Sequence, residues 1–262
     1  MNQSAPAARF APGTFSPDPR PNSRPAMLAA QTRLELILLL RNGEQLLLTM
    51  FIPITLLIGM TLLPFGDLGS HRVDKIVPAV MMVAVMSTAF TGQAIAVGFD
   101  RRYGALKRLG ATALPRWGII AGKSAAVLIV VVLQAILLGA IGFALGWRPG
   151  IAGLALGAVV IALGTATFAA MGLLLGGTLK AEVVLALANI LWFILLGIAS
   201  VVFATDHLPT AVNILARLAP SGALAVCLEE AMRSSVDWFG LAVLLVWGGV
   251  SGALATRYFR FQ

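Results

Sequence analysis

One short stretch carries residue types that could hold a nucleotide. Gly118, Gly122 and Lys123-Ser124 resemble a phosphate-binding loop, in which backbone N–H groups and a lysine bind the phosphates. The phosphate-binding motif has four residues between its glycines, and only three are found here. The motif also follows a strand, and no strand is predicted before Gly118. We therefore expect the chain itself to bind no ATP.

A second stretch, Glu229-Glu230-Ala231-Met232-Arg233, is close to the paired-glutamate motif of intramembrane proteases but is one residue short of it. Both histidines fall in predicted loops, so no span supplies a histidine for a metal site or for acid–base chemistry. Glu229 and Arg233 are four residues apart, which predicts an ion pair on a helix surface. We expect no catalytic residue, metal site or cofactor site in this chain.

The amino-acid composition is that of a membrane protein rather than of a soluble domain. Of 262 residues, 59% are hydrophobic and 11% are charged, and the mean hydropathy is +0.92. Soluble domains are about 45–50% apolar and about 25% charged, so this chain lies outside that class. The net charge of +8 is spread over loops between apolar runs, which argues against a nucleic-acid partner. We predict an all-α integral membrane protein.

We predict six transmembrane helices within a domain over 44–262, because the apolar runs are about 20 residues long, the length needed to cross a bilayer. The predicted spans are about 46–65, 76–98, 122–147, 151–177, 183–204 and 239–256. Residues 1–25 hold six prolines and no apolar run, and we expect a disordered tail there. Residues 26–43 are predicted to form an interfacial helix.

Some residues within the spans bear on how the helices pack. Pro53 should kink the first span, because proline removes a backbone donor. Glycines four residues apart, such as Gly172 and Gly176, indicate close approach of neighbouring helices. Gln134 and Asn189 are polar groups deep in their spans, and either could bond a neighbouring helix or line a substrate pathway.

The basic residues predict the orientation. With six spans, 14 of the 19 lysines and arginines fall on the side of the two termini. Positive charge is concentrated in cytoplasmic segments of membrane proteins, so we expect both termini in the cytoplasm.

The largest cytoplasmic loop, 99–121, is strongly basic. Spacings of three place Tyr103, Leu106 and Leu109 on one side of a predicted short helix over 100–109, which Gly110 would end. Such a helix could insert its apolar side into a groove of a soluble partner. Alternatively, the loop only fixes the topology and binds anionic lipid headgroups.

This loop resembles the signature region of the type 2 ABC-exporter permeases, such as bacterial multidrug and antibiotic efflux permeases. The positions that follow the family's order are Asp100, Arg101, Gly104, Leu106, Leu109, Thr112, Leu114, Arg116, Gly122 and Lys123. The chain departs from the pattern in having Asp100 for the usual Glu, and Ala113 where proline is common. The resemblance implies a coupling helix that docks on a separate ATP-binding subunit and is formed by Asp100, Arg101, Tyr103, Gly104, Leu106 and Leu109.

A second large loop, 205–238, lies on the outer side in this topology. Pro209 and Pro220 each sit where a short helix could begin. The resemblance implies a short re-entrant helical hairpin that closes the translocation pathway. An ordinary surface hairpin is the alternative.

Two functions of different classes remain. The resemblance implies the permease subunit of an ATP-driven exporter for a lipophilic or amphipathic drug or lipid, in the bacterial cell membrane. It would pair with a second permease, identical or related, while partner subunits bind ATP and Mg²⁺. The second candidate function is that of a secondary transporter or a membrane-embedded enzyme, which acts without an ATPase partner. Ionisable groups within spans would favour that second class, and the last four predicted spans contain none from residue 124 onward.

Overall fold

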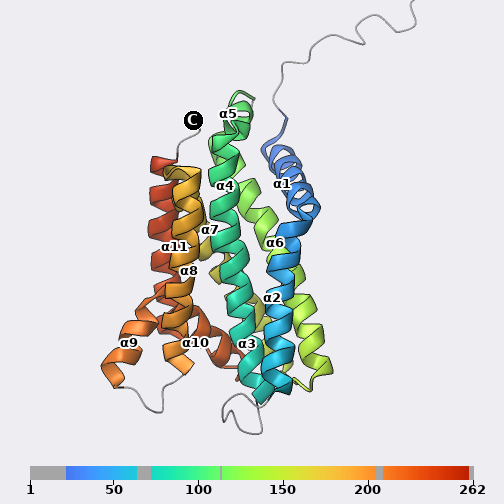
Figure 1. Cartoon of the computed structure of the whole chain (residues 1–262), viewed down its shortest axis with the longest axis vertical. Coiled ribbons are helices and arrows are strands. Elements are labelled where there is room, and N and C mark those ends of the chain that lie inside the picture. Colours follow the sequence, from blue (N-terminus) through green and yellow to red (C-terminus); the bar gives the residue numbers. More distant parts are fainter. Residues whose placement is uncertain (1–21, 64–71, 113, 204–208, 260–262) are drawn as a thin grey trace, which may run out of the picture.

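The computed structural model describes residues 22–63, 72–112, 114–203 and 209–259, and the regular elements in these ranges are helices (Figure 1). In chain order they are α1 Arg24–Arg41, α2 Gly43–Leu62, α3 Arg72–Val85, the π-helix η1 Met86–Gly92, α4 Gln93–Arg102, α5 Ala105–Gly110, α6 Arg116–Ala144, α7 Ile151–Thr178, α8 Ala181–Phe203, α9 Thr210–Leu218, α10 Pro220–Met232 and α11 Trp238–Tyr258. Most of the predicted tail, 1–21, lies outside the described residues.

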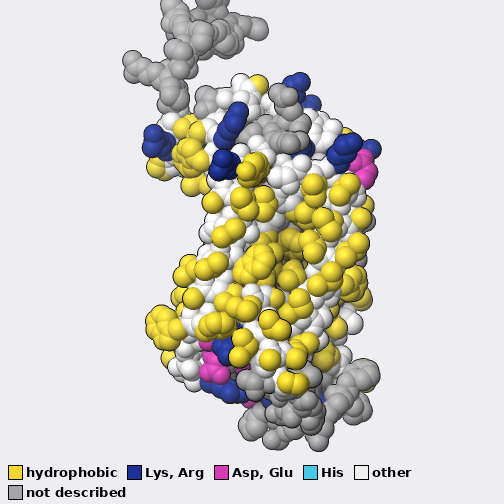
Figure 2. Space-filling model, turned by 90° about the vertical axis from the view of Figure 1, so that its left-hand side faces the viewer, with side chains coloured by type: hydrophobic (Ala, Val, Ile, Leu, Met, Phe, Trp, Pro, Cys, Tyr) yellow, Lys and Arg dark blue, Asp and Glu magenta, His cyan; other side chains and the backbone are white. Residues whose placement is uncertain are grey.

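The helices have the length and composition of a membrane bundle. The continuous stretch Arg72–Arg102, α6, α7, α8 and α11 are each long and apolar enough to cross a bilayer. The first predicted span, 46–65, corresponds to α2, whose described apolar part is the shorter stretch Thr49–Leu62. Figure 2 shows a broad apolar band on one face, with Lys and Arg at one end and mixed charges at the other. The prediction of an all-α membrane protein is confirmed.

Helix α7 packs through its glycines, as predicted. A methyl group added at Gly176 would lie 2.4 Å from the carbonyl oxygen of Ala94 on α4. In the other half of α7, a methyl group added at Gly153 would lie 3.0 Å from the carbonyl oxygen of Ala231 on α10. A side chain would collide with backbone at Gly176 and would crowd it at Gly153. Glycine therefore allows α7 to approach α4 closely with one half and α10 with the other.

The carbonyl group that Pro53 leaves without a helical donor in α2 is hydrogen-bonded by another helix. Proline has no N–H to donate to the carbonyl four residues earlier, that of Thr49. Gln134 on α6 donates its Nε2 to this carbonyl oxygen at 3.2 Å and accepts at Oε1 a hydrogen bond of 2.9 Å from the hydroxyl of Thr88 on η1. Gln134 is 1% exposed, so its amide joins three helices inside the bundle.

Candidate functional site: the coupling segment and a membrane groove

The loop that resembles the coupling helix forms one tip of the bundle (Figure 1). The prediction of a single helix over 100–109 is wrong in its extent: α4 continues to Arg102, and α5 begins at Ala105. Gly104 separates them with φ +70°, a left-handed conformation that glycine adopts without steric cost. The end of the helix at Gly110 agrees with the prediction.

The apolar side of α5 faces its own bundle. Leu106 is 0% exposed and packs in a cluster with Val97 of α4 and Ile119 of α6, and Leu109 lies against this cluster. Tyr103, by contrast, is 68% exposed. The predicted stripe of Tyr103, Leu106 and Leu109 is therefore divided, since Leu106 anchors α5 and Tyr103 lies at the surface.

Two arginines at the end of α4 hold neighbouring helices. The guanidinium of Arg101 donates to the carbonyl oxygens of Gly176 at 3.1 Å and Leu179 at 2.8 Å. These lie at the end of α7, where carbonyls lack helical donors. Arg102 pairs with Glu182 in the first turn of α8 at 2.5 Å. The second pair is largely exposed and contributes at most about 1 kcal/mol.

Lys123, in the second turn of α6, makes a buried ion-pair network. Its Nζ lies 2.6 Å from Oδ2 of Asp100 and 2.8 Å from Oε2 of Glu35 on α1. Gln31 donates its Nε2 to Oε1 of the same glutamate at 2.7 Å. A methyl group added at Gly122 would lie 2.5 Å from Cγ of Gln31. The Gly-Lys pair therefore admits α1 beside α6 and binds its carboxylate.

A groove of about 690 Å³ opens between α2, the η1–α4 stretch and α8. It is lined by Asn42, Thr49, Ile52, Ser87, Thr91, Gly92, Ile95, Phe99, Leu185, Asn189, Trp192 and Phe193. None of these lining residues carries a charge. The walls thus combine aromatic and aliphatic side chains with neutral hydrogen-bonding groups.

The two polar residues predicted as pathway candidates differ in their surroundings. Asn189 lines the groove, and its amide donates to the carbonyl oxygen of Leu185 at 2.7 Å. Nearby, the indole N–H of Trp192 donates to Oγ of Ser87 at 3.1 Å. Gln134 is not among the lining residues and serves the α2 break instead.

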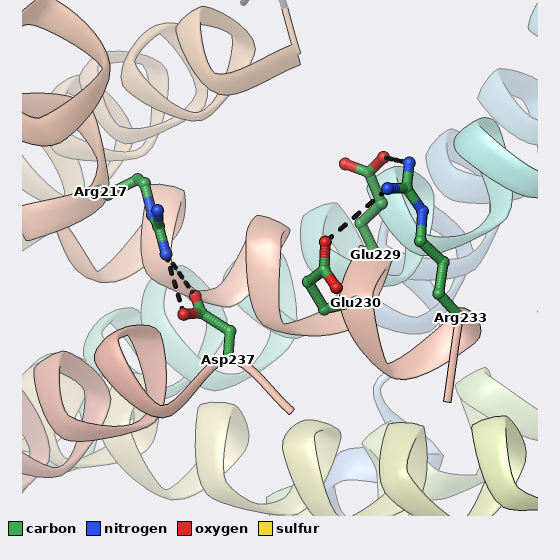
Figure 3. A network of polar contacts seen from close by, with 5 residues as sticks. All are labelled: Arg217, Glu229, Glu230, Arg233 and Asp237. Atoms are coloured by element: carbon green, nitrogen blue, oxygen red, sulfur yellow. Dashed lines mark hydrogen bonds and ion pairs between the residues drawn. The ribbon is translucent and has the colours of Figure 1, made fainter. Parts of the chain in front are cut away.

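At the end of the bundle opposite α5, α9 and α10 meet at an angle of 99° (Figure 1). Arg217 at the end of α9 donates to both carboxylate oxygens of Asp237, which precedes α11, at 2.8 and 2.9 Å (Figure 3). Glu229 and Arg233 form the predicted pair at 2.7 Å. The helices begin next to Pro209 and at Pro220, as predicted.

Residues 28–226 match the family described as ABC-2 type transporter. The chain belongs to this family. It is accordingly the membrane-spanning permease part of an ABC transporter, and the family implies an ATP-binding subunit as partner. No curated protein matches the chain.

The sequence pattern located the tip of this permease but missed the partners of Lys123. Gln31 and Glu35 are four residues apart, which places them on one side of α1. In the sequence they read as polar interruptions of an apolar helix. Their spacing was the available signal, because two polar residues on one side of a membrane helix need polar partners.

Proposed function

We propose that this ABC-2 permease forms half of the translocation pathway of an ATP-driven exporter in a bacterial inner membrane. Two permeases, identical or related, would face each other and bind two ATP-binding subunits. Both described ends, Arg24 of α1 and Tyr258 of α11, lie at the end of the bundle that carries α5 (Figure 1). We assign this end to the cytoplasm, in keeping with the excess of basic residues expected there.

The observation that carries this proposal is the arrangement of α5. Its buried side fixes it to the bundle through Leu106, while Tyr103, Lys107 and Arg108 are exposed at the tip. A basic surface with one exposed aromatic ring is suited to a pocket with acidic walls, because complementary charge favours and orients such a contact. We propose that this surface docks on the ATP-binding subunit.

The groove has walls that suit an amphipathic compound. Its apolar walls would hold the body of a lipophilic or amphipathic compound. The neutral groups, Asn189 and the partnerless buried hydroxyl of Thr91, would bond its polar part. The groove lies on the side of the bundle, between α2 and α8, so a second permease facing it would complete the pathway.

Movement would begin at α5 when ATP draws the ATP-binding subunits together. Asp100, Arg101 and Arg102 follow one another in the chain and bond α6, α7 and α8 respectively. A displacement of the tip would therefore reach three helices at once. Opening on the far side would involve the α9–α10 hairpin, which the Arg217–Asp237 pair holds in place here.

The test is co-purification of the permease with an ATP-binding subunit, followed by ATPase measurements in nanodiscs. Arg108→Glu, which reverses an exposed charge on α5, should weaken the complex and lower the stimulation of hydrolysis. Arg257→Glu makes the same change on an exposed residue near the cytoplasmic end of α11 and should have little effect. Equal binding and stimulation for wild type and both variants would contradict docking through α5.

A further inference from the structure

A single ammonium group joins three helices beneath the coupling segment. Lys123 belongs to α6 and is 4% exposed. Its two carboxylate partners are Glu35 on α1 and Asp100 near the end of α4. Both contacts are shorter than 3 Å. The Glu35 side chain is 8% exposed and that of Asp100 is 34% exposed, so the pair with Glu35 is the one that lies out of water, where the attraction between unlike charges is stronger than at a surface.

The orientation of α1 depends on this network. Gln31 and Glu35 are buried, whereas Leu34 and Leu38 on the outer side are 44% and 56% exposed. The side that faces the bundle thus carries Gln31 and Glu35, with Leu39 packed against the core, while the outward side carries leucines and the exposed Arg33. The ion pair of Glu35 with Lys123 on α6 therefore helps to set this orientation.

Helix α1 also leads directly to the wall of the groove. Asn42, the residue between α1 and α2, donates its backbone N–H to Leu38 at 3.2 Å and accepts at its carbonyl from Leu46 at 3.0 Å. The chain therefore passes from α1 into α2 with its backbone hydrogen bonds maintained. Asn42 itself and Thr49 of α2 line the groove.

We propose that Lys123 is a positioning residue for transport, and that it makes α1 a second moving part beside the coupling segment. Through Asp100 it holds the end of α4 that leads into α5, and through Glu35 it holds α1. A displacement at the docking surface then reaches the groove by way of α1 and α2, in addition to the path along α4. This inference rests on the proposed function.

The charges of the network determine which variants can test it. Lys123→Met leaves two carboxylates without their cation, and that alone destabilises a buried site. The triple variant Glu35→Gln, Asp100→Asn and Lys123→Met removes every charge together. It therefore separates the loss of the contacts from the burial of an unpaired charge. Lys123→Arg keeps the cation and serves as the matched control.

Hydrogen–deuterium exchange of the purified permease provides the first measurement. We expect faster exchange in α1 and α5 for Lys123→Met and for the triple variant, with α10 unchanged and Lys123→Arg close to wild type. If α1 in the triple variant exchanges as in wild type, Lys123 does not position that helix and the inference fails. This measurement needs no ATP-binding subunit, so it stands apart from the test of the proposed function.

ATPase stimulation of the reconstituted complex is the second measurement. Leu106 still anchors α5 in the triple variant, so we expect the ATP-binding subunit to co-purify. Stimulation should fall about 5- to 150-fold, the range for loss of a coupling between two sites. Wild-type stimulation by the triple variant would show that the network only balances buried charge, and would overturn the inference. Absence of stimulation by wild type would instead contradict the proposed function.

Discussion

The side-chain amide of Gln134 donates to the carbonyl oxygen of Thr49, the group that Pro53 leaves without its helical donor. Gln134→Leu should lower the free energy of unfolding by about 0.6–2 kcal/mol, the range for hydrogen bonds between membrane helices. The loss should be smaller in a Pro53→Ala background, because alanine restores the N–H that bonds Thr49. A double-mutant cycle on detergent-solubilised protein measures this difference, and strictly additive effects would contradict the assignment.

Leu106 and Tyr103 should respond in opposite ways to truncation. Leu106→Ala removes a fully buried side chain and should lower the free energy of unfolding by about 2–5 kcal/mol. Tyr103→Ala should change it by no more than about 0.5 kcal/mol, as is usual for exposed positions, while weakening the complex with the ATP-binding subunit. Thermal unfolding and co-purification give the two readings. A stable Leu106→Ala variant that lost its partner would place Leu106 in the interface after all.

Two glycines in neighbouring spans, one tightly packed and one in open space, allow the effect of an added methyl group to be compared. At Gly176 an added methyl group meets backbone at 2.4 Å, so Gly176→Ala should destabilise the bundle by about 1–3 kcal/mol. At Gly197 on α8 nothing lies within 4 Å, and Gly197→Ala should be neutral or stabilise by up to about 1 kcal/mol. Thermal melting in one detergent compares them. Similar losses at both positions would argue against the close approach of α7 and α4.

The one cysteine reports on the α9–α10 hairpin, which the proposed orientation places on the outer side. Cys227 is 2% exposed, and its Sγ lies 3.8 Å from the carbonyl oxygen of Asp237. A membrane-impermeant maleimide added from outside should therefore label it slowly. Arg217→Gln removes the ion pair to Asp237 and should raise the rate about 5- to 30-fold, corresponding to about 1–2 kcal/mol of easier opening.

Arg233→Gln is the control for this labelling, because it breaks an exposed pair on the same hairpin and should leave the rate unchanged. Labelling of wild type only from the cytoplasmic side would reverse the proposed orientation. An unchanged rate in Arg217→Gln would show that this ion pair does not hold the hairpin closed.

The sequence was sufficient for the fold because membrane spans are local properties. Length and apolar composition locate α6, α7, α8 and α11 without knowledge of their neighbours. The details of the site depend on contacts between distant segments. Glu35 and Lys123 are 88 residues apart in the chain, and no spacing rule connects them. Likewise, Leu106 appears on an apolar stripe in the sequence, but only the packing of α4 and α6 shows that it faces inward.

The break at Gly104 shows the same limit on a smaller scale. The residues before and after it are compatible with one helix, but in the structure Gly104 has a left-handed φ and Leu106 packs in a cluster with Ile119. Glycine permits both continuation and reversal of the chain. Tertiary packing decided between them.

The 99° turn between α9 and α10 has a consequence for how such transporters can be assembled. Because the hairpin enters and leaves on the same side, it adds no crossing, and the described chain starts and finishes at one end of the bundle (Figure 1). Two copies could then be joined head to tail by a linker that stays on one side of the membrane. Gene duplication and fusion would produce a single polypeptide carrying both halves of the pathway, with no additional membrane segment.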